Sequence, residues 1–185
     1  IVLHLASQTN LYAALSWTIV ALARRPADVE RILADDPDRR YLDQCASEAI
    51  RLGQRSLTLR KVLRPCEVFD GTEHYTVAPG AFVATMLSVT NPTAAPGLHE
   101  YDPNHYDRAR LAKDVPVETR EQVSTFGHAV HACPGQRFAL AAIRRAVLEL
   151  FGPYLTKVAI DEHIARGDMA GLGRIALLYL VVVGG

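Results

Sequence analysis

The sequence predicts a mainly α fold with small β-sheets, and three features of the chain lead to this prediction. Residues 1–23 and 134–151 are long segments with the apolar content of helices. Between them, residues 56–86 hold short runs of β-branched and aromatic residues, separated by Asp-Gly and Pro-Gly turns. Residues 88–124 are rich in Pro, Asn, Asp and Gly and predict a long loop, an uncommon feature that often carries function. No linker or internal repeat divides the chain, so we expect residues 1–185 to belong to one domain.

The first helix is the longest uncharged stretch of the chain. Residues 1–23 carry no formal charge, and the stretch ends at Arg24, Arg25 and Pro26, a common helix stop. Its length raises the question of a membrane span, but several polar residues within it would then lie in hydrocarbon. We therefore expect a helix buried in a protein core.

The remaining elements are shorter. Helices are expected at residues 28–35 and 41–52, the second closed by Gly53 at its C-terminal boundary. Residues 56–86 are expected to form several strands. The tail, residues 175–183, has the composition of an apolar β-strand and is too short to cross a bilayer as a helix.

Charge and cysteine content exclude some classes of function. Twenty basic residues balance twenty acidic ones, so nothing indicates binding to nucleic acid or to a membrane surface. The three cysteines, Cys45, Cys66 and Cys133, are odd in number and widely spaced, which is no disulfide framework. A reducing compartment fits this pattern.

The segment around Cys133 has the chemistry of a metal-bound thiolate. Cys133 precedes Pro134, a residue favoured at the first position of a helix, so the thiolate is expected at a helix N-terminus. Free N–H groups and the positive end of the helix dipole stabilise an anion there. Gly127 and Gly135 allow the tight turns that bring a loop close to a flat cofactor.

Two other interpretations of this segment remain open from the residues alone. Cys133 could be a buried cysteine with ordinary histidine neighbours, or it could bind zinc together with His128 and His131. The spacing of these three residues matches no common zinc pattern, and a fourth ligand is not evident.

Residues 126–139 resemble the haem-binding signature of the cytochrome P450 family. Six residues fall on its fixed positions: Phe126, Gly127, His131, Cys133, Gly135 and Ala139. One departure is Ala129, where the family usually has Gly, and an alanine is strained there if its backbone φ is positive.

The resemblance implies haem b as the cofactor, with Cys133 as the axial ligand of the iron. A thiolate ligand pushes electron density onto iron and favours O–O cleavage. His131 and Arg60 lie at family positions that commonly bind the haem propionates, with Lys61 and Arg64 as nearby alternatives.

Glu48 and Arg51 resemble the E-x-x-R pair of the same family. They are three residues apart on an expected helix and can therefore form an ion pair. In the family an arginine from a later segment joins the pair, and the resemblance points to Arg110, with Arg108 as the alternative. The expected role is structural, because a buried glutamate between two arginines holds the loop that supports the cysteine.

Residues 6–11 resemble the oxygen-activation motif of the family's central helix. Thr9 replaces the usual acidic residue and Asn10 the usual threonine, and we expect both to be catalytic. An amide can position water but does not titrate. The stretch is similar to two branches of the family, one of which hydroxylates its substrate while the other rearranges a peroxide.

The resemblance covers roughly the C-terminal half of a family member, without the N-terminal half of the domain. It implies a monooxygenase that inserts one atom of O2 into an apolar substrate, such as a sterol, a terpenoid or a lipid. Electrons would come from a ferredoxin or a flavoprotein reductase. The alternatives are a haem-catalysed peroxide rearrangement and an inactive truncated relic. The isolated fragment is expected to be inactive, and residues 169–173 are expected at the family's final hairpin. The short spacing between Pro26 and Glu48 resembles that of soluble bacterial members, so the resemblance implies a cytoplasmic enzyme.

Overall fold

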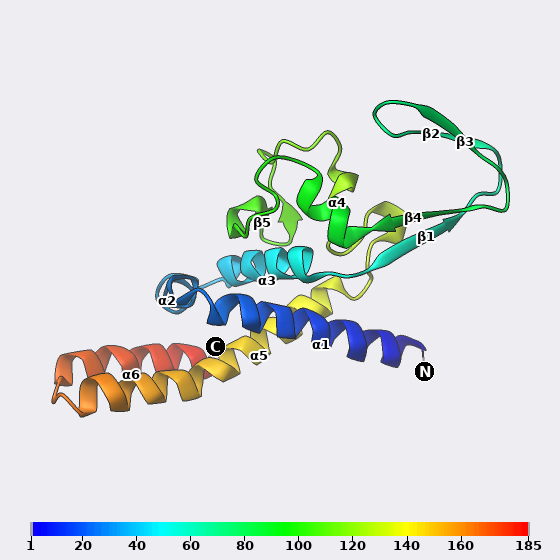
Figure 1. Ribbon diagram of the computed structural model, residues 1–185. Coiled ribbons are helices and arrows are strands. Elements are labelled where there is room, and N and C mark those ends of the chain that lie inside the picture. Colours follow the sequence, from blue (N-terminus) through cyan, green and yellow to red (C-terminus); the bar gives the residue numbers. More distant parts are fainter. Residues whose placement is uncertain (1, 185) are drawn as a thin grey trace.

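The computed structural model describes the backbone of residues 2–184 and the side chains of residues 8–180, and it confirms a mainly α fold with small sheets. Helix α5 packs against both α1 and α6, and α3 packs on α1 (Figure 1). The helices are α1 (Val2–Ala23), α2 (Pro26–Ala34), α3 (Arg40–Gly53), α4 (Leu87–Thr93), α5 (Gln136–Val158) and α6 (Met169–Gly184). The strands are β1 (Leu57–Lys61), β2 (Cys66–Phe69), β3 (His74–Val77), β4 (Phe82–Met86), β5 (Tyr106–Asp107) and β6 (Arg110–Leu111).

The main core lies between α1, α3 and α5. Apolar residues recur at helical spacing on α3 and on α5, and each helix turns that stripe toward the other. The buried members include Leu42, Ala46 and Ile50 of α3, with Ile143, Val147 and Leu155 of α5. Trp17 of α1 closes one end of this core, because a Cβ at Gly53 would stand 2.5 Å from its ring. Gly53 therefore allows close packing as well as ending α3.

The predicted strands are present and form two antiparallel hairpin-like pairs. β1 pairs with β4, with Leu57 opposite Met86, and β2 pairs with β3, with Cys66 opposite Val77. The β2–β3 hairpin extends away from the helices (Figure 1). Its turn is closed by Asp70, whose Oδ1 accepts two backbone hydrogen bonds of 2.8 Å. A third, two-residue pair joins β5 and β6.

The segment predicted as a long loop contains short regular elements. α4 begins at Leu87, and 3-10 turns follow at Pro103–His105 and Arg120–Gln122. A second small apolar cluster centred on Leu98 fills the interior of this segment. Arg120 fixes its far end by donating to the carbonyl oxygens of Ala112 and Lys113 at 2.7 and 2.6 Å. The loop is therefore packed and hydrogen-bonded along its length.

The tail was expected as a strand, and this prediction is wrong. Met169–Gly184 forms α6, which turns Ile175 and Leu178 onto the core beside α5. A spacing of three residues places both on one helical face, and a helix satisfies its own backbone hydrogen bonds without a partner strand. The hairpin expected at residues 169–173 is replaced by the first turn of this helix.

Between residues 2 and 184, none of the helices combines the length and the apolar character that crossing a bilayer demands.

Candidate functional site

Cys133 lies at the end of a closed loop that begins at Phe126. The Cys133 N–H donates to the Phe126 carbonyl oxygen at 2.6 Å, which joins the two ends of the loop. Within it, the His131 N–H donates to the carbonyl oxygen of His128 at 2.9 Å. The Cys133 side chain is exposed. The loop therefore holds its backbone by internal hydrogen bonds and presents the thiol outward.

Helix α5 begins two residues later than predicted. Pro134 and Gly135 form a turn, closed by the Gln136 N–H donating to the Cys133 carbonyl oxygen at 3.2 Å. Pro134 is thus not the first helical residue. The thiol still lies beside the helix start, because its Sγ is 3.8 Å from the point where a Gly135 Cβ would stand.

Two residues of the loop have positive φ. Gly127 has a φ of +75°, and a Cβ there would stand 2.3 Å from the His131 carbonyl oxygen, so this position requires glycine. Ala129 has a φ of +47°. This is the strained case expected for an alanine in place of the family's glycine, at a cost of about 1–2 kcal/mol.

Exposed apolar side chains flank the thiol. Val130 is 91% exposed on the loop, and Phe138 is 65% exposed on the first turn of α5. His131 is also exposed. Arg60 is exposed on β1, where its Nη1 lies 3.5 Å from Thr58 Oγ1. No hydrogen bond joins Arg60 to the loop among the residues that the structure describes.

The predicted pair of Glu48 and Arg51 is in contact and fully buried. Arg51 Nε donates to Glu48 Oε2 at 2.7 Å, and Nη2 donates to Oε1 at 2.6 Å, a bidentate arrangement. Both side chains have no exposed surface. The Arg51 guanidinium also donates to the carbonyl oxygens of Asn91, Leu98 and Glu100 at 3.1, 2.6 and 3.3 Å. The pair thereby ties α3 to the packed loop.

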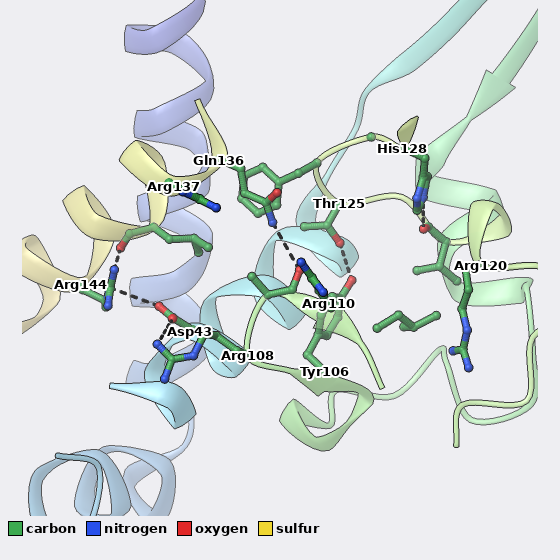
Figure 2. A pocket seen from close by; sticks show the side chains of 16 residues that line it. Asp43, Tyr106, Arg108, Arg110, Arg120, Thr125, His128, Gln136, Arg137 and Arg144 are labelled. Atoms are coloured by element: carbon green, nitrogen blue, oxygen red, sulfur yellow. Dashed lines mark hydrogen bonds and ion pairs between the residues drawn. The ribbon is translucent and has the colours of Figure 1, made fainter. Parts of the chain in front are cut away.

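The third member of this network is His105, and the prediction of Arg110 is wrong. His105 Nδ1 lies 2.9 Å from Glu48 Oε1, and the Asp102 N–H donates to the same oxygen at 3.1 Å. The chain reverses between β5 and β6, so Arg110 is exposed and lines a cleft (Figure 2). The alternative, Arg108, pairs with Asp38 at 2.6 Å.

Asn91 connects the buried pair to the cysteine loop. Its Nδ2 donates to the carbonyl oxygens of Arg51 and Ser124 at 3.2 and 2.9 Å, and its Oδ1 accepts from the Ser124 N–H at 2.9 Å. Ser124 Oγ in turn accepts from the Gly127 N–H at 3.2 Å. A continuous path of hydrogen bonds therefore runs from Arg51 to the loop. The sequence carried no signal for Asn91, because an Asn-Pro step in a Pro-rich stretch resembles an ordinary turn.

Further contacts fix the entry to the loop. The Tyr106 hydroxyl is hydrogen-bonded to Thr125 Oγ1, and burial raises the pKa of Tyr106. His128 Nε2 lies 2.8 Å from the Val123 carbonyl oxygen. No group of three potential ligands that could hold a metal ion occurs among the described residues, so the zinc interpretation gains no support.

Thr9 and Asn10 lie near the N-terminal end of α1 and are exposed. The adjacent Leu11 packs against the core, and Thr9 lies about 160° around the helix from it. The side chains of Ala6 and Ser7, which begin the motif, lie outside the described residues. Thr9 is thus directed away from the α3–α5 core, whereas Asn10 is exposed about 100° around the helix from Leu11.

The fold is similar to that of a haem domain of known structure. No protein-family model matches the chain. Its structure is similar to the crystal structure of the cytochrome P450DA heme domain, with a TM-score of 0.54 and 21% identity, over 72% of this chain and 32% of that one. At this identity the similarity concerns the fold.

Sequence comparison gives the family. The chain is 34% identical over 145 residues to cytochrome P450 monooxygenase prx8 of Penicillium rubens. It is equally similar to cytochrome P450 monooxygenase ORF5 of Penicillium roqueforti, and in both cases the match covers 71% of this chain. The chain belongs to the cytochrome P450 family. It spans about a quarter of the length of these relatives.

The residues around Cys133 fit a haem. Beside its exposed apolar side chains the loop presents a soft thiol sulfur, a ligand suited to iron. Gly127 and Gly135 keep the loop backbone free of Cβ atoms on either side of the cysteine. A flat apolar cofactor would cover Val130, which otherwise exposes nearly all of its surface.

Proposed function

We propose that this chain is the C-terminal, thiolate-bearing part of a haem-thiolate monooxygenase domain, which inserts one atom of O2 into an apolar organic substrate. The observation that carries the proposal is the outward-facing Cys133 thiol on a loop held by a hydrogen-bonded path from a fully buried ion pair. A structural cysteine would be buried and would need no such support.

The residues of this chain would hold the haem and orient its thiolate ligand. Cys133 would be the axial ligand of haem b, and the N–H groups at the start of α5 would stabilise its anionic form. Phe126, Gly127 and Gly135 would shape the loop on the side of the ring. Haem with a thiolate ligand supplies the activation of O2.

His131 and Arg60 are proposed to bind the haem propionates. Both are exposed, and neither is neutralised by a carboxylate among the described residues. A guanidinium can bind a carboxylate through two parallel N–H groups, whereas an imidazole donates through one nitrogen at a time.

Thr9 and Asn10 are proposed to position water and protons on the open face of α1. The Thr9 hydroxyl can both donate and accept, whereas the Asn10 amide can orient water but cannot supply a proton. The exposed amide favours a second candidate function, a haem-catalysed rearrangement of a peroxide without external electrons. Product formation from O2 with a reductant, compared with peroxide alone, separates the two. Hydroxylation that depends on O2 would eliminate the rearrangement.

The partners follow from the proposed chemistry. O2 activation requires electrons, which we assign to a ferredoxin or a flavoprotein reductase. The substrate is proposed to be an apolar small molecule, in the class of sterols, terpenoids or lipids. All three cysteines are free, which supports a location in the reducing cytoplasm.

The deciding experiment is the absorption spectrum of the dithionite-reduced protein under carbon monoxide. We expect a strongly red-shifted Soret band that is absent from Cys133→Ala. The matched control is Cys66→Ala, since Cys66 is also an exposed free cysteine but begins strand β2. Haem binding with no red-shifted band in the parent protein would refute the thiolate assignment. A stoichiometric haem content would remove the alternative of an inactive relic without cofactor.

A further inference from the structure

A cleft of about 630 Å³ opens between α3, the β5–β6 pair, the cysteine loop and the start of α5 (Figure 2). Five arginines and one carboxylate, that of Asp43, line it. The arginines are Arg108, Arg110, Arg120, Arg137 and Arg144. Phe126 and Gly127 line it but Cys133 does not, so the cleft adjoins the cysteine loop without including the thiol. The excess of positive charge in a concave site concentrates the electrostatic field there.

Three of the five arginines are already engaged. Arg120 donates to backbone carbonyl oxygens of the packed loop. Arg108 and Arg144 lie 3.5 and 3.3 Å from the two carboxylate oxygens of Asp43, whose side chain is only 3% exposed. These contacts hold the cleft walls together. Through these contacts the one carboxylate that lines the cleft, that of Asp43, already pairs with two arginines.

Arg110 and Arg137 differ from the other three. Neither guanidinium group makes a hydrogen bond or an ion pair with any residue in the described part of the chain. Arg110 comes from β6 and Arg137 from the first turn of α5, so the two free guanidinium groups belong to different walls of one cleft (Figure 2). Gln136 Nε2 donates to the Ala109 carbonyl oxygen at 3.3 Å and joins these walls. The backbone segments that carry Arg110 and Arg137 are therefore joined directly.

We propose that this cleft binds a small organic anion with two oxyanion groups, such as a phosphate ester or a dicarboxylate, between Arg110 and Arg137. Each guanidinium presents a planar fork of donors that matches a carboxylate or a phosphate. A volume of about 630 Å³ falls within the range of small-molecule sites and exceeds the space that one phosphate needs. The free arginines line a cleft whose volume is that of a small-molecule site, so a small ligand can fill it.

The test measures binding of pyrophosphate and of succinate to the haem-loaded protein by isothermal titration calorimetry at constant ionic strength. These probes separate the two sources of a dianion. We expect saturable one-to-one binding of at least one of them. Arg110→Gln and Arg137→Gln should each weaken it about tenfold, since each removes a charge-assisted hydrogen-bonding group. The control is Arg145→Gln, an equal change of charge at an exposed α5 residue that pairs with Glu149, and it should change affinity less than twofold.

Three outcomes would overturn the proposal. The first is no saturable binding of either probe, and the second is an equal loss of affinity in Arg145→Gln, which would indicate general charge attraction. The third is binding of a poly-glutamate peptide, lost in the double variant Arg110→Gln/Arg137→Gln, with no binding of the small probes. That result would assign the cleft to an acidic protein. The carbon monoxide band should be unchanged in the double variant, so failure here is distinguishable from failure of the haem proposal.

Discussion

Replacing Asn91 by alanine tests whether the buried ion pair supports the cysteine loop. The change removes three side-chain hydrogen bonds, two from Nδ2 and one to Oδ1, at a position with no exposed surface. At about 1 kcal/mol for each bond, the free energy of unfolding should fall by about 3 kcal/mol. For a chain of this size that loss lowers the melting temperature by about 6–12 °C. The partners left unpaired are the backbone groups of Arg51 and Ser124, so the loop should also lose its fixed position.

The assay combines thermal unfolding with the carbon monoxide spectrum of the same samples. Asn91→Asp should not restore stability, although it has the same shape. Its second oxygen would face the two carbonyl groups to which the amide now donates. Asn104→Ala is the control, because Asn104 is exposed and its amide donates within its own turn to Asp102. The reasoning is refuted if Asn91→Ala unfolds within 2 °C of the parent, or if it is destabilised while the red-shifted band keeps its full intensity.

Four further changes test the loop, the ion pair and the cysteines. Gly127→Ala places a Cβ 2.3 Å from a backbone oxygen of the same loop, so the fraction of protein with the red-shifted band should drop sharply. Ala129→Gly should raise the free energy of unfolding by up to about 1 kcal/mol in urea titrations, because relief of strain at a φ of +47° exceeds the added freedom of the unfolded chain. Arg51→Lys keeps the charge but loses the bidentate geometry, and a loss of about 3 kcal/mol or more is expected, with a loss below 1 kcal/mol contradicting it. Burial raises the pKa of Cys45 to about 12, which depletes its thiolate. At pH 8 a thiol reagent should therefore modify Cys45 about a thousandfold more slowly than exposed Cys66, and equal rates would show that Cys45 is accessible.

The local elements could be predicted because short-range chemistry specifies them. Asp70 and Gly71 carry the turn chemistry of a hairpin, and the four strands of the β1–β4 segment lie where the sequence predicts them. Glu48 and Arg51 could be paired from their spacing alone, since residues three apart share one helical face. The helix of the tail could not be predicted, because the β-branched residues of this segment favour a strand. The spacing of its packed residues fits a helix, and α5 provides the face against which that helix packs.

The identity of the third residue in the ion network depends on distances across the fold. His105 and Arg110 both come from the segment that the family resemblance indicates, and both carry N–H donors. The 3-10 turn before β5 brings the His105 ring to Glu48, while the reversal after β5 carries Arg110 into the cleft. The sequence contains no local pattern that distinguishes the two, because the choice is made by the path of the chain between them.

The order of residues along the chain was enough to identify the cysteine loop and its glycines. The spacing of Glu48 and Arg51 allowed them to pair, but their burial was expected from the family resemblance and not from the spacing. The sequence also identified Ala129 as a departure from the family's haem-binding signature, but only the structure shows, by a φ of +47°, that this residue is strained. The tertiary structure alone decided that Asn91 links the pair to the loop, that His105 completes the network and that two free arginines share one cleft. The hydrogen bonds of Asn91 to Ser124 and of His105 to Glu48 join residues 33 and 57 positions apart, and packing of the whole chain brings these residues within hydrogen-bonding distance.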